Sequence, residues 1–345
     1  MLQLLCVGEA LVDRLGPPGG DPAAAPADQL DDRLGGAPAN VACALARLGT
    51  SAGFIGRLGR DAIGAAFAEL FAARGVDTSA LQWDVQRPSR IVLVQRDAGG
   101  ERSFGGFAGD QGAGFADQAL DADELAPCLD CLLGSFETSD PVELTSGCPG
   151  VPAWLLTGTI PLASAASAQA LGLLLDRGEA CGLKLAVDVN WRPTFWDSQL
   201  APDASPTPVV KARLRPLLER ADLIKCAAEE AQWLFGGTDP AVISAALPRR
   251  PDVLITDGAR PLRWCVAGEA GQRDSYAVPV VDTTGAGDAF TAGLLHSLCA
   301  HPDWPVERRM AFASACGALV CQGAGAIDPQ PTEGQALSFM AAQGA

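Results

Sequence analysis

The chain has 345 residues, of which 48% are hydrophobic and 19% are charged, so it can bury a large core and is not a disordered protein. Its 41 acidic residues outnumber 25 basic ones, and the net charge of −16 opposes binding to nucleic acid and to anionic membranes. The same charge repels nucleotides, so a phosphate site here has to be built from helix ends, a divalent cation and a few placed basic residues.

Targeting signals and metal motifs are weak in this sequence. No apolar run approaches the roughly 20 residues of a membrane-spanning helix, and the first residues lack the features of a secretion signal. The eleven cysteines follow no repeated spacing, which predicts a reduced, cytoplasmic protein. Cys128 and Cys131 form a lone C-x-x-C pair far in sequence from His296 and His301, so we expect ordinary helix cysteines rather than a zinc or redox site.

The chain begins with a predicted buried strand at residues 2–8, followed by acidic residues. Ligands of open parallel sheets bind beyond the carboxyl ends of the strands, so Asp13 is placed to accept hydrogen bonds from substrate hydroxyls. A solvated residue at a strand end is the alternative for Asp13.

A Pro-rich loop leads to Gly35 and Gly36, which allow close backbone approach, and then to a helix that carries Asn40 in its first turns and ends at Gly49. A strand at 51–58 and a helix from Arg60 to about Arg74 follow.

Residues 90–107 predict short strands around a turn at 98–101. We expect a small β lid from about residues 13–34 and 86–108, in which Phe104 and Phe107 mainly pack. Residues 121–150 are rich in turns, and no function is predicted for them.

Alternating strands and helices continue through the second half, which predicts an α/β fold. Strands are expected at 153–157, 183–189, 221–225 and 253–257, with a helix at 164–177 and another beginning at Glu229 and Glu230. Residues 262–266 and 276–281 are expected to form a late antiparallel pair, and 306–321 an Ala-rich helix. Arg192, just after the strand at 183–189, is one of few cations available for phosphate, although a solvated turn is its alternative.

The segment 281–290 reads V-D-T-T-G-A-G-D-A-F and predicts a glycine turn leading into a helix. A helix N-terminus offers free N–H groups and the positive end of the helix dipole, so the amides of Gly285, Ala286 and Gly287 can receive an anion. Asp288 lies in the first helical turn, where an ionised carboxylate can accept a proton from a hydroxyl. An anion hole beside a base predicts a kinase that acts on an alcohol.

The segment 282–290 resembles the C-terminal signature of the ribokinase-like (PfkB) carbohydrate kinases, and the chain is most similar to their fructokinase branch. The resemblance implies one doubly wound α/β domain over residues 1–345, with a mostly parallel sheet, flanking helices and a β lid. It assigns Asp288 as the catalytic base and the Gly285–Ala286–Gly287 backbone as the anion hole. It also implies contacts with the sugar from Asp13, Gly35, Gly36 and Asn40.

The same resemblance implies further roles at the nucleotide end of the site. Residues implied in phosphate or nucleotide binding are Asn190, Arg192, Lys225, Thr256, Gly258, Ala313 and Gly317. Glu230 is implied to orient Mg²⁺ through water, although an alanine replaces the usual polar residue nearby. Asp282 and Thr284 match positions that contribute to a monovalent cation site in potassium-activated relatives.

We therefore expect ATP and Mg²⁺ to phosphorylate a sugar, with fructose as the leading substrate. Ketodeoxygluconate, ribose and nucleoside kinases remain alternatives, because lid residues set the sugar pocket. A non-catalytic sugar- and nucleotide-binding regulator is an alternative of another class. A nicotinamide dehydrogenase is disfavoured because no G-x-G-x-x-G follows the first strand. Lids of this family often pair across dimers, so a homodimer through the lid is one of the oligomeric states that the resemblance allows, and the sequence does not decide among them.

Overall fold

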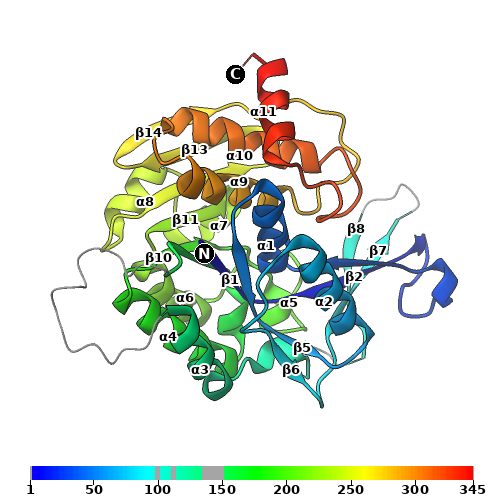
Figure 1. Cartoon of the computed structure of the whole chain (residues 1–345). Coiled ribbons are helices and arrows are strands. Elements are labelled where there is room, and N and C mark those ends of the chain that lie inside the picture. Colours follow the sequence, from blue (N-terminus) through cyan, green and yellow to red (C-terminus); the bar gives the residue numbers. More distant parts are fainter. Residues whose placement is uncertain (1, 98–101, 110–113, 134–150, 345) are drawn as a thin grey trace.

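The computed structural model describes residues 2–97, 102–109, 114–133 and 151–344. Its largest element is a sheet with the strand order β14-β13-β12-β11-β10-β9-β1-β4 (Figure 1). All neighbouring pairs from β12 to β4 are parallel, and β13 and β14 extend the sheet in antiparallel fashion. The strands are β1 (Leu4–Val7), β4 (Ala52–Ile55), β9 (Trp154–Thr157), β10 (Lys184–Asp188), β11 (Leu223–Ala227), β12 (Asp252–Asp257), β13 (Arg260–Val266) and β14 (Glu269–Arg273).

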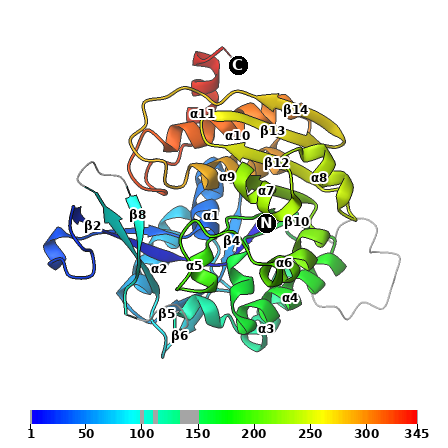
Figure 2. The ribbon, with the colours of Figure 1, turned by 180° about the vertical axis from the view of Figure 1, so that it is seen from behind.

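Helices cover both faces of this sheet (Figures 1 and 2). One face packs against α1 (Ala37–Leu48), α2 (Ala62–Arg74), α9 (Ala286–Ala300), α10 (Val306–Val320) and α11 (Glu333–Ala342). The other packs against α3 (Ala122–Leu133), α4 (Ala165–Ala180), α6 (Pro208–Arg220), α7 (Ala228–Phe235) and α8 (Pro240–Ala246). The strand period of two explains the division: Leu4 and Cys6 belong to the first core, and Leu5 and Val7 to the second. The expected α/β fold is confirmed.

Helix boundaries follow residues with clear capping chemistry. The Ser164 hydroxyl accepts a hydrogen bond from the Ser167 N–H at the start of α4, and Asp61 accepts one from Gly64 N–H at the start of α2. Gly75 ends α2 with a φ of +72°, a conformation that glycine adopts without strain.

A smaller sheet, in the order β3-β2-β7-β8, projects from one side of the molecule (Figure 2). It consists of β2 (Leu11–Pro18), β3 (Asp31–Gly35), β7 (Arg90–Arg96) and β8 (Arg102–Phe107), which come from both segments expected to form the lid. Arg90 is 1% exposed, pairs with Asp117 and lies over the rings of Phe107 and Phe195, so Phe107 packs as expected. The turn at 98–101 lies outside the described residues.

The fold also contains the parallel pair β5 (Arg57–Gly59) and β6 (Gln82–Asp84), the short α5 (Pro193–Trp196), and short 3-10 helices at Ala27–Gln29, Ala116–Ala119 and Ile160–Ala163. Of the turn-rich stretch 121–150, residues 134–150 lie outside the described residues, and the rest contributes α3 with Cys128 and Cys131. Within the described part of the chain, every helix is too short or too polar to span a lipid bilayer.

The predicted antiparallel pair between 262–266 and 276–281 is wrong. β13 pairs instead with β14, because Ala267 (φ +51°) and Gly268 (φ +82°) form a tight turn that closes a hairpin directly after Val266. Residues 276–281 form no strand, and the Val280 and Val281 side chains are 62% and 66% exposed. The segment is anchored by backbone bonds from Val281 and Asp282 N–H to the Cys321 carbonyl.

Candidate active site

A cavity of about 650 Å³ lies beyond the carboxyl ends of the parallel strands. Its wall includes Glu9 after β1, Ile160 after β9 and Asn190 after β10, while Asp13 and Phe104 face it from the smaller sheet. From β1 the chain runs first to β4 on one side and later to β9 on the other, so the cavity lies at the point where the winding reverses. Ligands of open α/β sheets bind at such a point.

Asp288 lies in the first turn of α9 and lines this cavity. The Asn40 side chain, from α1, donates a 2.7 Å hydrogen bond from Nδ2 to Asp288 Oδ2. Burial raises the pKa of Asp288 to about 6, and Asn40, Lys225 and Arg192 oppose that rise. The carboxylate is therefore ionised at neutral pH, yet basic enough to accept a proton.

The turn before α9 presents its backbone to the same cavity. Gly285 adopts φ +76° and ψ 0°, and a Cβ there would meet the Ala326 Cα at 2.7 Å, so glycine is required. Ala286 N–H donates to the Thr283 carbonyl at 3.2 Å, whereas the Gly285 and Gly287 N–H groups have no acceptor among the described residues. Ala286 is thus less available to an anion than the sequence suggested, while Gly285 and Gly287 remain available.

A buried ion pair supports the cavity floor. Lys225 Nζ lies 3.1 Å from both carboxylate oxygens of Asp188. The two residues are direct partners in the parallel pairing of β10 with β11. Thr291 Oγ1 donates a further hydrogen bond to Asp188 Oδ2 at 2.9 Å. Burial lowers the pKa of Lys225, but Asp188 and Glu230 outweigh it and raise the pKa, so the ammonium stays charged. Its Nζ lies 3.1 Å from the position that a Cβ on Gly287 would take, beside the free amide.

Asn190 and Arg192 line the same cavity, as their position after β10 predicted. Asn190 has a φ of +39°, which asparagine tolerates better than most residues. Glu230 also lines the cavity, but its oxygens accept hydrogen bonds from Trp191 N–H at 2.6 Å and Ala227 N–H at 2.7 Å. It orders the backbone around the site, and a further contact has to use its remaining lone pairs.

The residues expected on the sugar side meet around β2 and the start of α1. Asp13, Gly36 and Asn40 line the cavity, and Gly35 lies directly behind Asp13, since a Cβ on Gly35 would sit 3.2 Å from Asp13 Oδ2. A Cβ on Gly36 would lie 2.6 Å from the Glu9 carbonyl oxygen, so a larger residue would displace the connection between β1 and β2.

Glu9 and Asp188 were not assigned a role from the sequence. Glu9 is 3% exposed, and its Oε1 accepts from Ala37 N–H at 3.1 Å, while Oε2 has no partner among the described residues. Burial raises the pKa of Glu9 to about 8, so this side chain is mostly protonated at neutral pH. Its position directly after a buried strand, in the phrase G-E-A-L-V-D, was the only signal for it.

A second cavity of about 460 Å³ adjoins the first and is lined mainly by apolar side chains, including Val278 and Phe290. Thr256, Gly258 and Gly317, three of the residues implied in nucleotide binding, lie on its wall. Ala313 does not: it is fully buried against Gly293 of α9, so it packs two helices together and is removed from the candidate adenine contacts. Thr283 and Gly287 line both cavities.

Asp282 organises the base of the glycine turn. Its Oδ1 accepts hydrogen bonds from the N–H and hydroxyl of Thr284, and its Oδ2 accepts one from Gly325 N–H at 2.8 Å. Arg33 of β3 lies 3.6 Å from the same carboxylate, which connects the smaller sheet to the turn. The side chains of Asp282 and Thr284 are therefore already engaged with one another.

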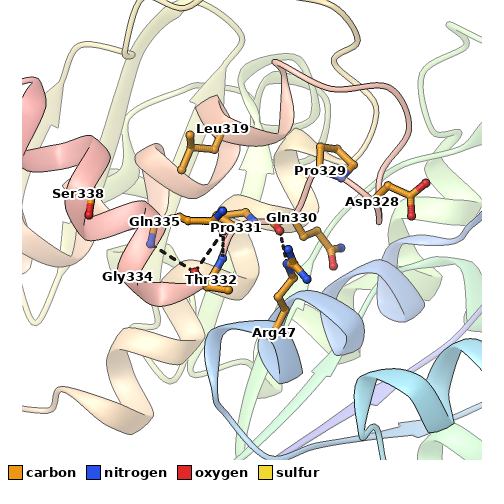
Figure 3. A pocket seen from close by; sticks show the side chains of 10 residues that line it. All are labelled: Arg47, Leu319, Asp328, Pro329, Gln330, Pro331, Thr332, Gly334, Gln335 and Ser338. Atoms are coloured by element: carbon orange, nitrogen blue, oxygen red, sulfur yellow. Dashed lines mark hydrogen bonds between the residues drawn. The ribbon is translucent and has the colours of Figure 1, made fainter.

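A third hollow, of about 780 Å³, is lined by residues of α1, α10, α11 and the segment before α11 (Figure 3). Arg47 donates from Nε to the Gln330 carbonyl at 2.5 Å and thereby ties α1 to the segment before α11. The remaining wall is formed by Leu319, Asp328, Pro329, Pro331, Thr332, Gly334, Gln335 and Ser338. Because none of these residues lines the first or the second cavity, the hollow is not part of the candidate active site.

Comparisons with known proteins agree with this geometry. The model of the pfkB family of carbohydrate kinases matches residues 1–130 and 167–333. The chain is 31% identical over 336 residues to a fructokinase of Escherichia coli (94% of this chain, 95% of the relative) and 30% identical over 312 residues to a fructokinase of Vibrio alginolyticus (89% and 91%).

Solved structures extend the similarity to the whole fold. A fructokinase with bound ATP from Xylella fastidiosa matches with a TM-score of 0.77 and 26% identity, covering 99% of each chain. A fructokinase double mutant from Vibrio cholerae O395, bound to fructose, ADP and potassium, matches with a TM-score of 0.76 and 28% identity, covering 99% of this chain and 98% of the other. The chain belongs to the pfkB family of carbohydrate kinases and is an ATP-dependent sugar kinase.

Proposed function

We propose that this kinase transfers the γ-phosphoryl group of ATP to D-fructose and yields D-fructose 6-phosphate and ADP. One observation carries the proposal: Asp288 and the free amides of Gly285 and Gly287 line a single cavity with Asn40. The fructokinases among its relatives, one of them bound to fructose and ADP, favour fructose as the acceptor.

In this mechanism, Asp288 accepts the proton of the attacking sugar hydroxyl while Asn40 fixes the orientation of the carboxylate. The Gly285 and Gly287 N–H groups, with Lys225 and Arg192, stabilise negative charge on the transferring phosphoryl group. Asp13 accepts hydrogen bonds from sugar hydroxyls. The apolar second cavity receives the adenine, with Gly317 on its wall, and Thr256 and Gly258 lie toward the phosphates.

The residues present fit a Mg²⁺ ion held mostly by water and substrate phosphates, which is the coordination that Mg²⁺ prefers. Glu230 would hold this ion indirectly, through a bound water molecule. Direct coordination is disfavoured because each of its two carboxylate oxygens already accepts a hydrogen bond from a backbone N–H group. When bound, the ion neutralises charge on the ATP phosphates. We also propose a potassium ion beside the anion hole, held mainly by backbone carbonyls, because Asp282 Oδ1 already accepts hydrogen bonds from the N–H and the hydroxyl of Thr284.

We also propose that the smaller sheet acts as a lid that closes over the sugar and excludes water. Its edge strands, β3 and β8, are candidates for pairing with a second copy of the chain, which molar mass in solution tests directly. Phe104 faces the cavity from β8 and would contact a bound sugar.

The experiment that tests the proposal measures ATP consumption by the purified chain with fructose, ribose, ketodeoxygluconate and adenosine. We expect the highest kcat/KM with fructose and a product phosphorylated at O6. A higher kcat/KM with another acceptor would move the chain to that branch of the family, and sugar binding without turnover would support the regulator alternative.

A further inference from the structure

The two histidines of this chain lie beside one carboxylate, outside the candidate active site. His296 lies in α9, His301 is the residue directly after the end of α9, and Glu333 is the first residue of α11. His301 Nε2 is 2.5 Å from Glu333 Oε1, and His296 Nε2 is 3.6 Å from the same oxygen. One nitrogen of each ring and one oxygen of Glu333 all lie within 4.8 Å of one another.

The ion pair between His301 and Glu333 leaves one buried atom of His296 without a hydrogen bond. The residue is 2% exposed, and its Nε2 has no hydrogen-bond partner among the described residues. An unsatisfied buried polar atom costs about 1–3 kcal/mol, so its persistence requires a reason. The other ring nitrogen, Nδ1, shares a 2.8 Å hydrogen bond with Thr50 Oγ1. If Nδ1 carries the proton, Nε2 is a free lone pair directed at Glu333.

This pattern is typical of a metal-binding histidine, whose second nitrogen donates to a neighbour that fixes the ring and its tautomer. Both rings are also held in place by stacking. The His301 ring lies parallel to Trp304 at a centroid distance of 3.9 Å, and the His296 ring stacks on Phe312 at 5.6 Å. The donor atoms are therefore preorganised rather than carried by mobile surface side chains.

We propose that His296 Nε2, His301 Nε2 and a Glu333 carboxylate oxygen bind one divalent d-block cation, with Zn²⁺ as the best match. Zn²⁺ accepts imidazole nitrogen at about 2.0–2.1 Å and carboxylate oxygen at about 2.0–2.2 Å, which places tetrahedral ligand atoms roughly 3.3 Å apart. Two imidazoles disfavour Mg²⁺ and Ca²⁺, which prefer oxygen ligands. The side chains of His301 and Glu333 are 28% and 34% exposed, so water can complete the coordination shell.

The ion would serve a structural purpose. It would join the end of α9 to the start of α11, and through Thr50 to the connection between α1 and β4. His296 is eight residues beyond Asp288 on α9, about 12 Å along the helix, so the ion does not touch the reacting groups. It would fix the far end of the helix whose first turn carries Asp288.

The test is a titration of the metal-free, full-length chain with Co²⁺, followed by displacement with Zn²⁺. We expect one equivalent of Co²⁺ with visible absorption of a tetrahedral nitrogen and oxygen site, no thiolate charge-transfer band, and a higher unfolding midpoint when Zn²⁺ is present. His301→Gln and Glu333→Gln change the more exposed ligands and should each weaken Zn²⁺ binding at least tenfold and remove the metal-dependent shift of the midpoint.

Cys131→Ser is the matched control. The exposed Cys131 thiol belongs to the C-x-x-C pair with Cys128, and this pair could bind the same metal ions at another place in the chain. The control should bind Zn²⁺ at this site as the parent does. The proposal is overturned if the parent binds no Co²⁺ beyond what Cys131→Ser removes, or if His301→Gln keeps the parent's affinity. In either case the three groups form only a hydrogen-bonded ion pair.

Discussion

Asn40 Nδ2 donates a 2.7 Å hydrogen bond to Asp288 Oδ2, although the two residues are 248 positions apart in the chain. The bond joins the start of α1 to the start of α9. It therefore brings the glycine-flanked segment near the N-terminus and the glycine turn near the C-terminus into one site.

Replacing Asp288 by Asn should remove the proton acceptor while keeping the size of the side chain. We expect kcat to fall by about 10²–10⁴, with dissociation constants for ATP and the sugar within a few-fold of the parent. Steady-state kinetics and calorimetric binding separate the two effects. Asp274→Asn, the same change at an exposed site, should leave kcat unaltered, and near-normal turnover by Asp288→Asn would exclude Asp288 as the base.

The pH dependence of activity should report the raised pKa of Asp288. Because the base must be ionised, kcat/KM should fall about tenfold per pH unit below about 6, rather than below the ordinary value of 3.8. The hydrogen bond from Asn40 lowers this pKa, so Asn40→Ala should move the acidic limb to higher pH. An acidic limb near pH 4 in the parent would contradict the assignment.

Glu9→Gln should change how stability depends on pH. The pKa of Glu9 rises from 4.5 to about 8 on folding, so between these values the folded state binds a proton that the unfolded state lacks. Stability from this group is complete below pH 4.5, decreases as the pH rises, and is lost above about 8. The free energy of unfolding at pH 9, measured in urea, should therefore be higher for Glu9→Gln than for the parent by a few kcal/mol.

At pH 4 the two chains should be nearly equal in stability, because Glu9 is then protonated in both the folded and the unfolded state. Glu229→Gln, at an exposed position, is the control and should track the parent at both pH values. Equal stability of Glu9→Gln and the parent at pH 9 would mean that Glu9 ionises freely in the folded chain.

The boundaries of this fold follow from local sequence, but its site chemistry depends on contacts between distant segments. The start expected at 164 and the end expected at about Arg74 were correct, because Ser164 and Gly75 cap these helices and capping depends on a few adjacent residues. The prediction of a strand at 276–281 was wrong. The Ala267–Gly268 turn places β14, rather than residues 276–281, beside β13.

Position after a strand was enough to place Asn190 and Arg192 at the edge of the sheet where the cavity lies, whereas Asp13 reaches the cavity from within β2 of the smaller sheet. The pairing of Asp188 with Lys225 was not predictable, because it requires the register between β10 and β11. The same holds for Glu9, whose raised pKa results from burial that the sequence does not reveal.

Asp188→Asn should test the buried ion pair. Removing one partner leaves the Lys225 ammonium in a site where it is 8% exposed, so we expect the free energy of unfolding to fall by about 3–5 kcal/mol. Glu219→Gln breaks the ion pair with Arg215 on the surface and should leave the free energy of unfolding nearly unchanged, because solvent screens exposed charges. Similar losses in the two variants, measured by urea unfolding, would show that water stabilises Lys225 without Asp188.

Gly285→Ala should damage the anion hole through sterics as well as backbone strain. Gly285 and Gly236 share a φ of +76°, but a Cβ on Gly285 meets Ala326 Cβ at 2.5 Å, whereas one on Gly236 meets nothing within 4 Å. Gly236→Ala should cost about 1–2 kcal/mol and retain turnover. Gly285→Ala should cost more and lower kcat at least tenfold, and equal effects in the two variants would remove the steric argument.

Thr283 and Gly287 line both cavities, so the two cavities share part of their wall. If one substrate displaces these shared residues, the shape of the other cavity, and with it the affinity for the other substrate, changes as well. Thermodynamic reciprocity then requires that a nucleotide analogue change the affinity for sugar by the same factor as the sugar changes the affinity for the analogue. The residues that separate the two cavities are therefore also the residues that directly couple binding in one cavity to binding in the other.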